Sequence, residues 1–177
     1  HDNMEIVSIP LEGALKHNDS TGREAIIKQG DVQIMSAGSG IQHSEFNNSK
    51  TDPVKFLQIW VFPKKENITP RYEQKSFTEE AKNNQFLTVV SPEENADSIW
   101  INQDAWFSLS NLDAGKSLNY NLHANTNGVY IFVLEGEMEA ANHTLKDRDA
   151  VGVYEVESVE ISAKTNSKVL VIEVPMA

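Results

Sequence analysis

Short runs of strand-forming residues, separated by turn residues, recur along the whole chain and constrain its fold more than any other feature. Roughly ten such runs are present, each rich in valine, isoleucine or aromatic residues. They cover residues 6–9, 25–27, 32–35, 56–62, 86–90, 105–109, 129–134, 150–154, 158–161 and 168–174. Many strands at short spacing predict an all-β fold, either a sandwich or a barrel.

Helical patterns are rare. Ser76-Phe77-Thr78-Glu79 has the form of a capping box, but Asn83 and Asn84 follow soon after, so we expect one or two helical turns. Residues 91–97 are acidic, turn-rich and free of large apolar side chains, which is typical of a linker. This linker near the middle of the chain predicts two domains, residues 1–90 and 91–177.

A weak internal repeat favours the same division. An apolar run leads into Leu-Glu-Gly at residues 11–13, and another leads into Leu-Glu-Gly at residues 134–136. Each is followed by an Asp-containing turn and a second apolar run, at residues 31–35 and 147–153. A period of about 120 residues indicates a duplicated domain rather than a solenoid.

Composition excludes several classes of protein. The 177 residues suffice for a buried core without disulfides or metal. The net charge of −11 argues against nucleic acid as a direct partner, because phosphate binding needs clustered lysine and arginine. The absence of cysteine excludes thiol catalysis and Cys-ligated zinc. No apolar run is long enough to span a membrane. A reducing cytoplasm is compatible with the absence of cysteine, and we expect a cytoplasmic protein and a monomer.

The densest chemical pattern lies in residues 35–47. A strand ends, small residues and glycines form a corner, and His43-Ser44-Glu45 follows. Residues two apart on a strand point to the same side, so a strand here brings the imidazole and the carboxylate together. That mixture suits a divalent metal. The alternative is a tight turn in which His43 and Glu45 are surface polar residues.

The other histidines give weaker patterns. His1 is a candidate third ligand. His17 lies in a polar stretch, residues 17–22, and we expect it in an exposed hairpin loop. His123 and His143 lie in polar turns, with no carboxylate or second histidine at a chelating offset, so we expect both to face solvent.

Two sets of residues resemble the two short motifs of the cupin family. They are His1, Glu5 and Gly13 for the end of the first motif, and Gly30, Gly40, His43 and Asn47 for the second, with Gly38 where a proline is usual. Four stretches narrow the resemblance to the pirin family of two-domain cupins: residues 1–5, 35–45, 58–60 and 68–74. The C-terminal half is similar to the second pirin cupin only loosely and lacks a His-x-His or His-x-Glu motif.

The resemblance implies two cupin (double-stranded β-helix, or jelly-roll) barrels, with one metal site in the N-terminal barrel. The implied ligands are His1, His43 and Glu45. Glu5 is not an implied ligand, but it would lie next to the ligands and support them. The first histidine of the motif would lie two residues before His1. We therefore expect the N-terminal barrel to be incomplete in this chain and a preceding segment to carry a fourth ligand. If His1 is a true N-terminus, its α-amine could chelate instead.

The resemblance also implies a quercetinase-type dioxygenase that opens a flavonol-type ring with O2. Fe(II) is the expected metal, with Zn, Ni, Mn, Cu or Co as substitutes. Glu45 would be both ligand and proton acceptor. Gln58 and Trp60, from a run that we expect to be covered on both faces, are candidates for the pocket wall. The alternative, which we favour for Trp60, is that their alternation only packs the barrel. The alternatives are a regulator whose metal state controls binding of a protein partner, and a structural cupin without metal.

Overall fold

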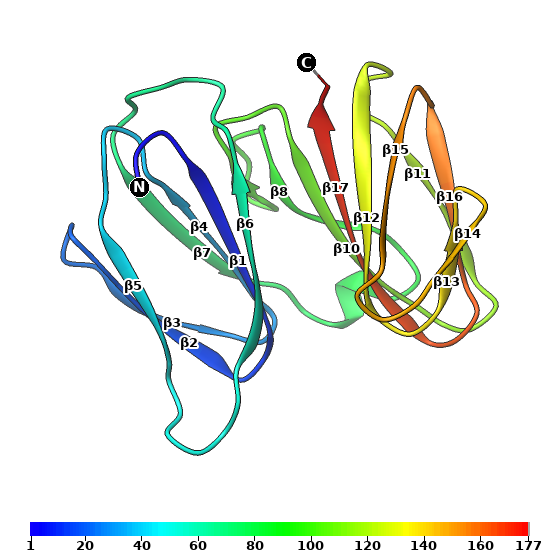
Figure 1. Cartoon of the computed structure of the whole chain (residues 1–177), viewed down its shortest axis with the longest axis horizontal. Helices are drawn as coiled ribbons and strands as arrows, with labels where there is room; N and C mark the ends of the chain where they lie inside the picture. Colours follow the sequence, from blue (N-terminus) through cyan, green and yellow to red (C-terminus); the bar gives the residue numbers. More distant parts are fainter. Residues whose placement is uncertain (177) are drawn as a thin grey trace. The chain divides into compact units, whose positions relative to one another are not determined.

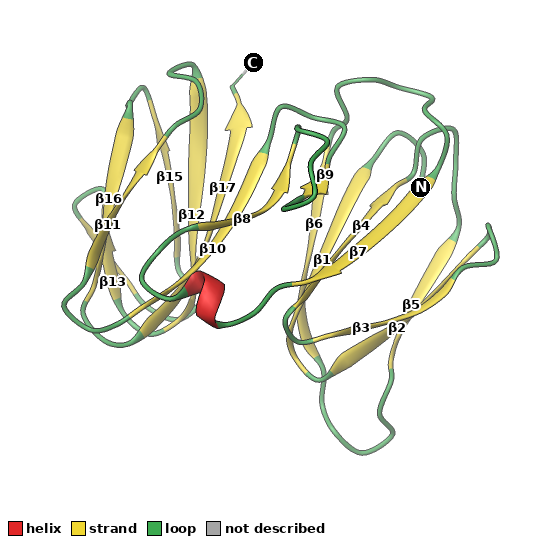
Figure 2. Cartoon of the chain, turned by 180° about the vertical axis from the view of Figure 1, so that it is seen from behind, coloured by secondary structure: helices red, strands yellow, loops and turns green. Residues whose placement is uncertain are grey.

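The computed structural model describes residues 1–176, and almost all of its regular structure is β-strand. Figure 1 shows the strands in chain order, and Figure 2 shows the single short helical turn among them, η1 (Glu80–Lys82). The chain divides into two compact units. The first contains residues 1–77 and 92–103, and the second contains residues 78–91 and 104–177. The division at residue 90 remains a prediction about where the cupin domains end.

The first unit contains two antiparallel sheets. One has the order β6-β1-β4-β7 and the other β3-β2-β5. The strands are β1 (Glu5–Glu12), β2 (Ala14–Asp19), β3 (Glu24–Lys28), β4 (Asp31–Ser36), β5 (His43–Asn47), β6 (Lys55–Val61) and β7 (Arg71–Ser76), with a short β9 (Ile99–Trp100). The central strand β4 is buried on both faces, so its near-continuous apolar sequence is expected.

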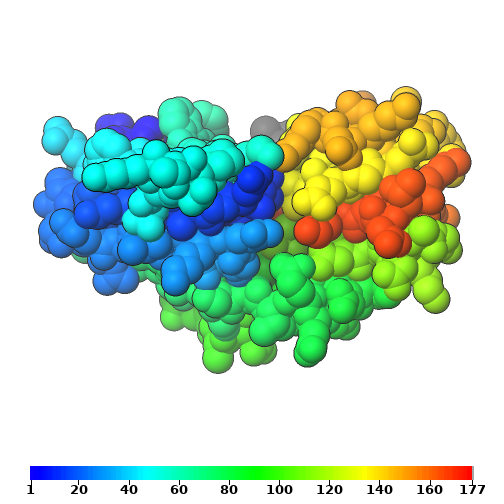
Figure 3. Space-filling view, turned by 90° about the horizontal axis from the view of Figure 1, so that it is seen from below, coloured from blue at the N-terminus to red at the C-terminus, as the bar shows by residue number. Residues whose placement is uncertain are grey.

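The second unit repeats this two-sheet arrangement. Its strands form the orders β15-β12-β17-β10-β8 and β11-β16-β13-β14. They are β8 (Leu87–Ser91), β10 (Trp106–Leu112), β11 (Ser117–Asn121), β12 (Asn127–Glu135), β13 (Met138–Ala140), β14 (His143–Leu145), β15 (Ala150–Tyr154), β16 (Ser158–Ala163) and β17 (Ser167–Pro175). Side chains from both sheets, such as Val129, Val171, Tyr120 and Ile161, form one core cluster. In the space-filling view of Figure 3, the N-terminal residues of the first unit (blue to cyan) form one continuous region, and the C-terminal residues of the second unit (yellow to red) form another.

The internal repeat has a structural counterpart. Strand β1 runs into Leu-Glu-Gly and pairs with β4, as β12 runs into Leu-Glu-Gly and pairs with β15. Gly13 and Gly136 both have positive φ, 74° and 92°. A Cβ atom would lie 2.6 Å from the Pro53 oxygen at the first and 2.7 Å from the Asn166 oxygen at the second. Only glycine suits either turn, which explains why the motif recurs.

The structure tests the expected elements. All ten predicted runs overlap strands, so the all-β prediction is confirmed, and the capping box yields only the single turn η1. One expectation about β6 is wrong, because the face that carries Trp60 (56% exposed) and Phe62 (77% exposed) is open to solvent. In the part of the chain that the structure describes, we find no helix of the length and apolarity required to cross a membrane.

Candidate metal centre

The glycine corner before His43 sets the direction of strand β5. Gly38 has φ 50°, and a Cβ atom there would collide with the backbone of Ile68. The Ser39 amide donates to the Ile68 oxygen at 2.9 Å, which fixes the corner against that loop. Strand β5 then begins at His43 and pairs with β2, so that His17 lies opposite Glu45 and Asp19 lies opposite His43.

This pairing brings His17, His43 and Glu45 into one group. Their candidate ligand atoms all lie within 4.8 Å of one another. The centroids of the two imidazole rings are 5.5 Å apart. Nδ1 of His17 and Nδ1 of His43 are both buried without a hydrogen-bond partner in the described structure. Unpartnered imidazole nitrogen atoms can bind a metal ion as ligands. The residues present therefore suit a divalent metal.

The expectation that His17 lies in an exposed loop is wrong. His17 is 0% exposed and belongs to β2, whose hairpin turn begins only after Asp19, where the Gly22 amide donates to the Asp19 oxygen. Its Nε2 lies 2.9 Å from Oδ2 of Asp19. The alternation of Leu15, His17 and Asp19 is the pattern in the sequence that indicates a shared face. The polar residues that follow His17 led to the prediction of a loop instead of a strand.

His1 lies next to this group without belonging to it. Its ring centroid is 5.1 Å from that of His43 and 4.9 Å from the centroid of Trp60. The Ile41 amide donates to the His1 oxygen at 2.9 Å, so the glycine corner also places His1. His43 therefore has two histidine rings as neighbours, those of His1 and His17. The role of His1 as a ligand remains a prediction.

Two polar side chains hold the carboxylate of Glu45. The Ser8 hydroxyl donates to Oε1 at 3.2 Å, and Nε2 of Gln58 donates to Oε2 at 2.6 Å. Nε1 of Trp60 donates in turn to Oε1 of Gln58 at 3.3 Å. The structure thus connects Gln58 and Trp60, both proposed from the sequence, to a candidate ligand.

Glu5 is placed elsewhere. It lies three residues before Ser8 on β1 and therefore on the other face of the sheet. Its carboxylate is 1% exposed and accepts hydrogen bonds from the Ser36 hydroxyl at 2.8 Å and the Asn102 amide at 3.2 Å. The structure does not bring Glu5 to the candidate ligands, contrary to the expectation that it supports them.

Electrostatics distinguish the imidazoles of His17, which is buried, and His43, which is half-buried. Burial lowers the pKa of His43, and the neighbouring Glu45 carboxylate only partly opposes this. Burial acts in the same direction on His17, but the carboxylates of Glu45 and Asp19 outweigh it and raise the pKa of His17. A neutral imidazole is the form that binds a metal, so His43 has the environment of a ligand.

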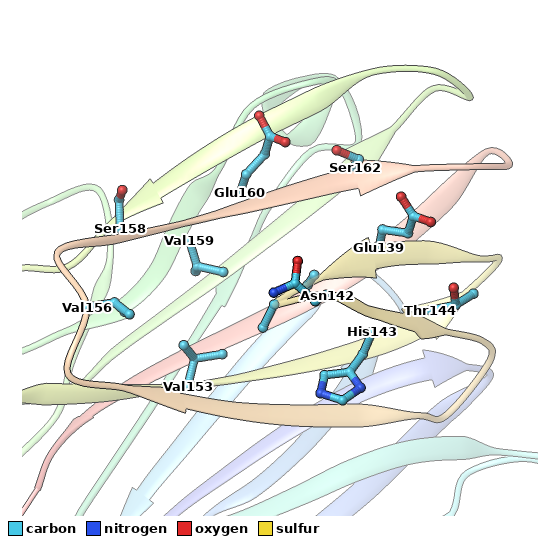
Figure 4. Close-up of a pocket in the computed structure, with 12 residues that line it drawn as sticks. Glu139, Asn142, His143, Thr144, Val153, Val156, Ser158, Val159, Glu160 and Ser162 are labelled. Atoms are coloured by element: carbon cyan, nitrogen blue, oxygen red, sulfur yellow. The ribbon is translucent and has the colours of Figure 1, made fainter.

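Within its described residues, the second unit has no comparable group of candidate ligands. His143 is exposed, as expected, and lines a pocket with Val153, Val156 and Val159 (Figure 4). Among residues 1–176, the group formed by His17, His43 and Glu45 is the one set of three or more candidate ligands close enough to hold a metal. His123 is also exposed, as expected, and its Nδ1 lies 2.7 Å from Oε2 of Glu173, a carboxylate that is distant in the sequence.

Comparison with known proteins decides the family. The family model described as pirin matches residues 1–61, and the model described as the quercetinase C-terminal cupin domain matches residues 88–174. The quercetin 2,3-dioxygenase of Escherichia coli strain K12 is 34% identical to the chain over 99% of the chain and 74% of its own length. The chain belongs to the pirin family.

Solved structures agree with this pirin assignment. The crystal structure of YhhW from Escherichia coli has a TM-score of 0.94 at 32% identity. The match covers 100% of this chain and 74% of YhhW. The structure of bacterial pirin YhhW in complex with nickel(II) has a TM-score of 0.92 at the same identity, with coverage of 100% and 75%. The cupin fold is confirmed, and the candidate metal centre lies in a pirin fold that is known to bind a divalent ion in YhhW.

Proposed function

We propose that this pirin is a metal-dependent dioxygenase that opens a flavonol-type ring with O2. One observation carries the proposal: the candidate ligand atoms of His43 and Glu45 lie together beside His17, and Nδ1 of His43 is buried without a hydrogen-bond partner in the described structure. Support also comes from the relative in Escherichia coli that is named quercetin 2,3-dioxygenase.

His43 and Glu45 are the ligands that both the motif and the geometry favour. An imidazole from His1, which the family resemblance implies, or from His17, which lies within the group, would complete the set. We propose Fe(II) as the working metal, while the nickel(II) complex of YhhW supports Ni(II) as a substitute. Neutral imidazoles with one carboxylate accept either ion.

When bound, the metal would supply Lewis acidity toward a substrate hydroxyl and the means of reacting with O2. Glu45 would take the proton of that hydroxyl on its carboxylate, which Ser8 and Gln58 hold in one orientation. Trp60, whose exposed ring lies beside His1, offers a flat apolar wall for an aromatic ring. A dioxygenase retains both oxygen atoms in its products, so the flavonol supplies the electrons and no further reductant is needed.

The test is turnover of quercetin by the Fe(II)-loaded and the Ni(II)-loaded protein, followed by loss of flavonol absorbance and by O2 uptake. Glu45→Ala should abolish both and lower metal content, whereas Glu24→Ala, at an exposed position on β3, should change neither. Flavonol oxidation that continues unchanged in Glu45→Ala would overturn the proposal.

A further inference from the structure

A row of four polar side chains crosses one face of the sheet β6-β1-β4-β7, the face that is open to solvent at β6 and covered at β1 and β4. Ser8 is paired with Gln58 on one side and with Gln33 on the other, and Gln33 is paired with Gln74. Residues directly opposite each other in antiparallel strands project on the same face. The row therefore reads Gln58, Ser8, Gln33 and Gln74 across the sheet, facing strands β5, β2 and β3.

Three members of this row have partners. Gln58 and Ser8 donate to Glu45 on β5, and Nε2 of Gln74 donates to the Ile26 oxygen on β3 at 3.0 Å. Gln33, between them, is different. It is 1% exposed, and neither its Oε1 nor its Nε2 has a hydrogen-bond partner within residues 1–176. A buried amide without partners is costly, so this group needs an explanation.

The neighbours of Gln33 show what it faces. Ser8 reaches β5 and Gln74 reaches β3, and strand β2 lies between β5 and β3. On β2, His17 is paired with Glu45 on one side and with Ala25 on the other, and we infer from these pairings that His17 is the residue of β2 that faces Gln33. Nδ1 of His17 is also buried without a partner, and it lies 3.8 Å from Oε1 of Glu45, too far for a direct hydrogen bond.

We propose that Gln33 and His17 hold one buried water molecule, and that through it Gln33 positions His17 against Glu45. The Gln33 amide offers a donor and an acceptor, and His17 offers Nδ1 because its Nε2 is engaged by Asp19. Buried waters typically have about three polar partners, and the Glu45 carboxylate is the third. His17 is then a positioning residue, which leaves His1, His43 and Glu45 for the metal.

The water site can be tested without metal. Gln33→Met keeps the volume of the side chain and removes its polar atoms. If the amide holds a water, the metal-free variant should unfold at least about 2 °C below the wild-type protein, because the water and His17 lose a partner. If the amide has no partner, the apolar replacement should unfold at the same temperature or higher, which overturns the proposal.

The positioning role rests on the proposed metal site and needs a second measurement. In the Co(II)-loaded protein, Gln33→Met should change the visible absorption bands and weaken Co(II) binding about tenfold. A variant that melts earlier but keeps the wild-type Co(II) spectrum and affinity overturns the positioning role. Failure of the wild-type protein to bind Co(II) would count against the proposed function, while the metal-free melting temperature still decides the water site.

Discussion

Nε2 of Gln58 lies 2.6 Å from Oε2 of Glu45, so an amide on β6 restrains a carboxylate on β5. The two strands belong to different sheets of the first unit. The orientation of a candidate ligand therefore depends on how the two sheets face each other, and not on the His43-Glu45 strand alone.

Gln58→Leu should weaken metal binding, because the carboxylate loses a donor that fixes its direction. Substitution of such an outer partner typically costs about 10- to 100-fold in affinity. Titration calorimetry with Ni(II) measures the change, and Gln29→Leu, in an exposed turn, serves as the matched control. Equal affinities for the two variants would show that Gln58 does not restrain the ligand.

His17→Gln should lower Ni(II) affinity by roughly 10-fold or more, since the buried imidazole contacts the ligand group. His143→Gln, at an exposed position in the second unit, should leave the affinity unchanged. The same titration compares both variants with the wild-type protein. A wild-type affinity in His17→Gln would remove His17 from the site and leave the histidine role to His1.

Glu173→Gln should destabilise the second unit by about 3 kcal/mol. Its buried carboxylate accepts hydrogen bonds from donors that include Nδ1 of His123 at 2.7 Å, Nδ2 of Asn127 at 2.8 Å and the Tyr120 hydroxyl at 2.9 Å. An amide offers one acceptor oxygen in place of two, so donors are left unpaired. Urea unfolding followed by circular dichroism measures the loss, and Glu157→Gln, an exposed residue, is the control.

The same carboxylate gives a pH dependence. Burial would raise the pKa of Glu173, but hydrogen bonds from His123, Asn127 and Tyr120 outweigh it and lower the pKa below its usual 4.5. This stabilisation is present above pH 4.5 and is lost as the pH falls through the folded-state pKa. Glu173→Gln should lack that acid-side loss, and a variant with the wild-type profile would exclude Glu173 as its source.

Glu5 has the opposite sign. Burial raises its pKa above 4.5, and the hydrogen bonds from Ser36 and Asn102 only partly oppose this. The unfolding free energy should therefore fall as the pH rises above 4.5 through the folded-state pKa, by at most about 1.4 kcal/mol per pH unit. Glu5→Gln, whose amide oxygen can still accept both bonds, should remove this fall. Urea unfolding between pH 5 and pH 8 checks it.

Local patterns predicted the apolar strands, because each run alternates or is continuously apolar within a few residues, but they missed polar strands such as β2, β7 and β11. The same patterns did not predict where the side chains of His17 and Glu5 lie. The polar residues around His17 suggested a loop, but strand pairing with β5 buries it opposite Glu45. Family resemblance predicts that Glu5 supports the ligands without binding the metal, but its position three residues from Ser8 turns it to the other face.

The environment of β6 could not be predicted from its sequence either. Apolar residues on both faces of the run indicate burial on both faces, but a strand's own residues do not show which neighbours cover it. In the described structure the face with Phe56, Trp60 and Phe62 is open, while the other face is half-buried. Similarly, the unpartnered Gln33 follows from pairings with two strands that are distant in sequence.

The position of Trp60 gives this protein an intrinsic optical probe. Its indole touches His1 and Gln58, whereas Trp100 stacks with Arg71 and Trp106 stacks with His123. A paramagnetic ion held beside His43 would quench the fluorescence of Trp60. Replacing the other two tryptophans with phenylalanine would leave one emitter, so the occupancy of the centre could be followed by light alone during a titration or a reaction.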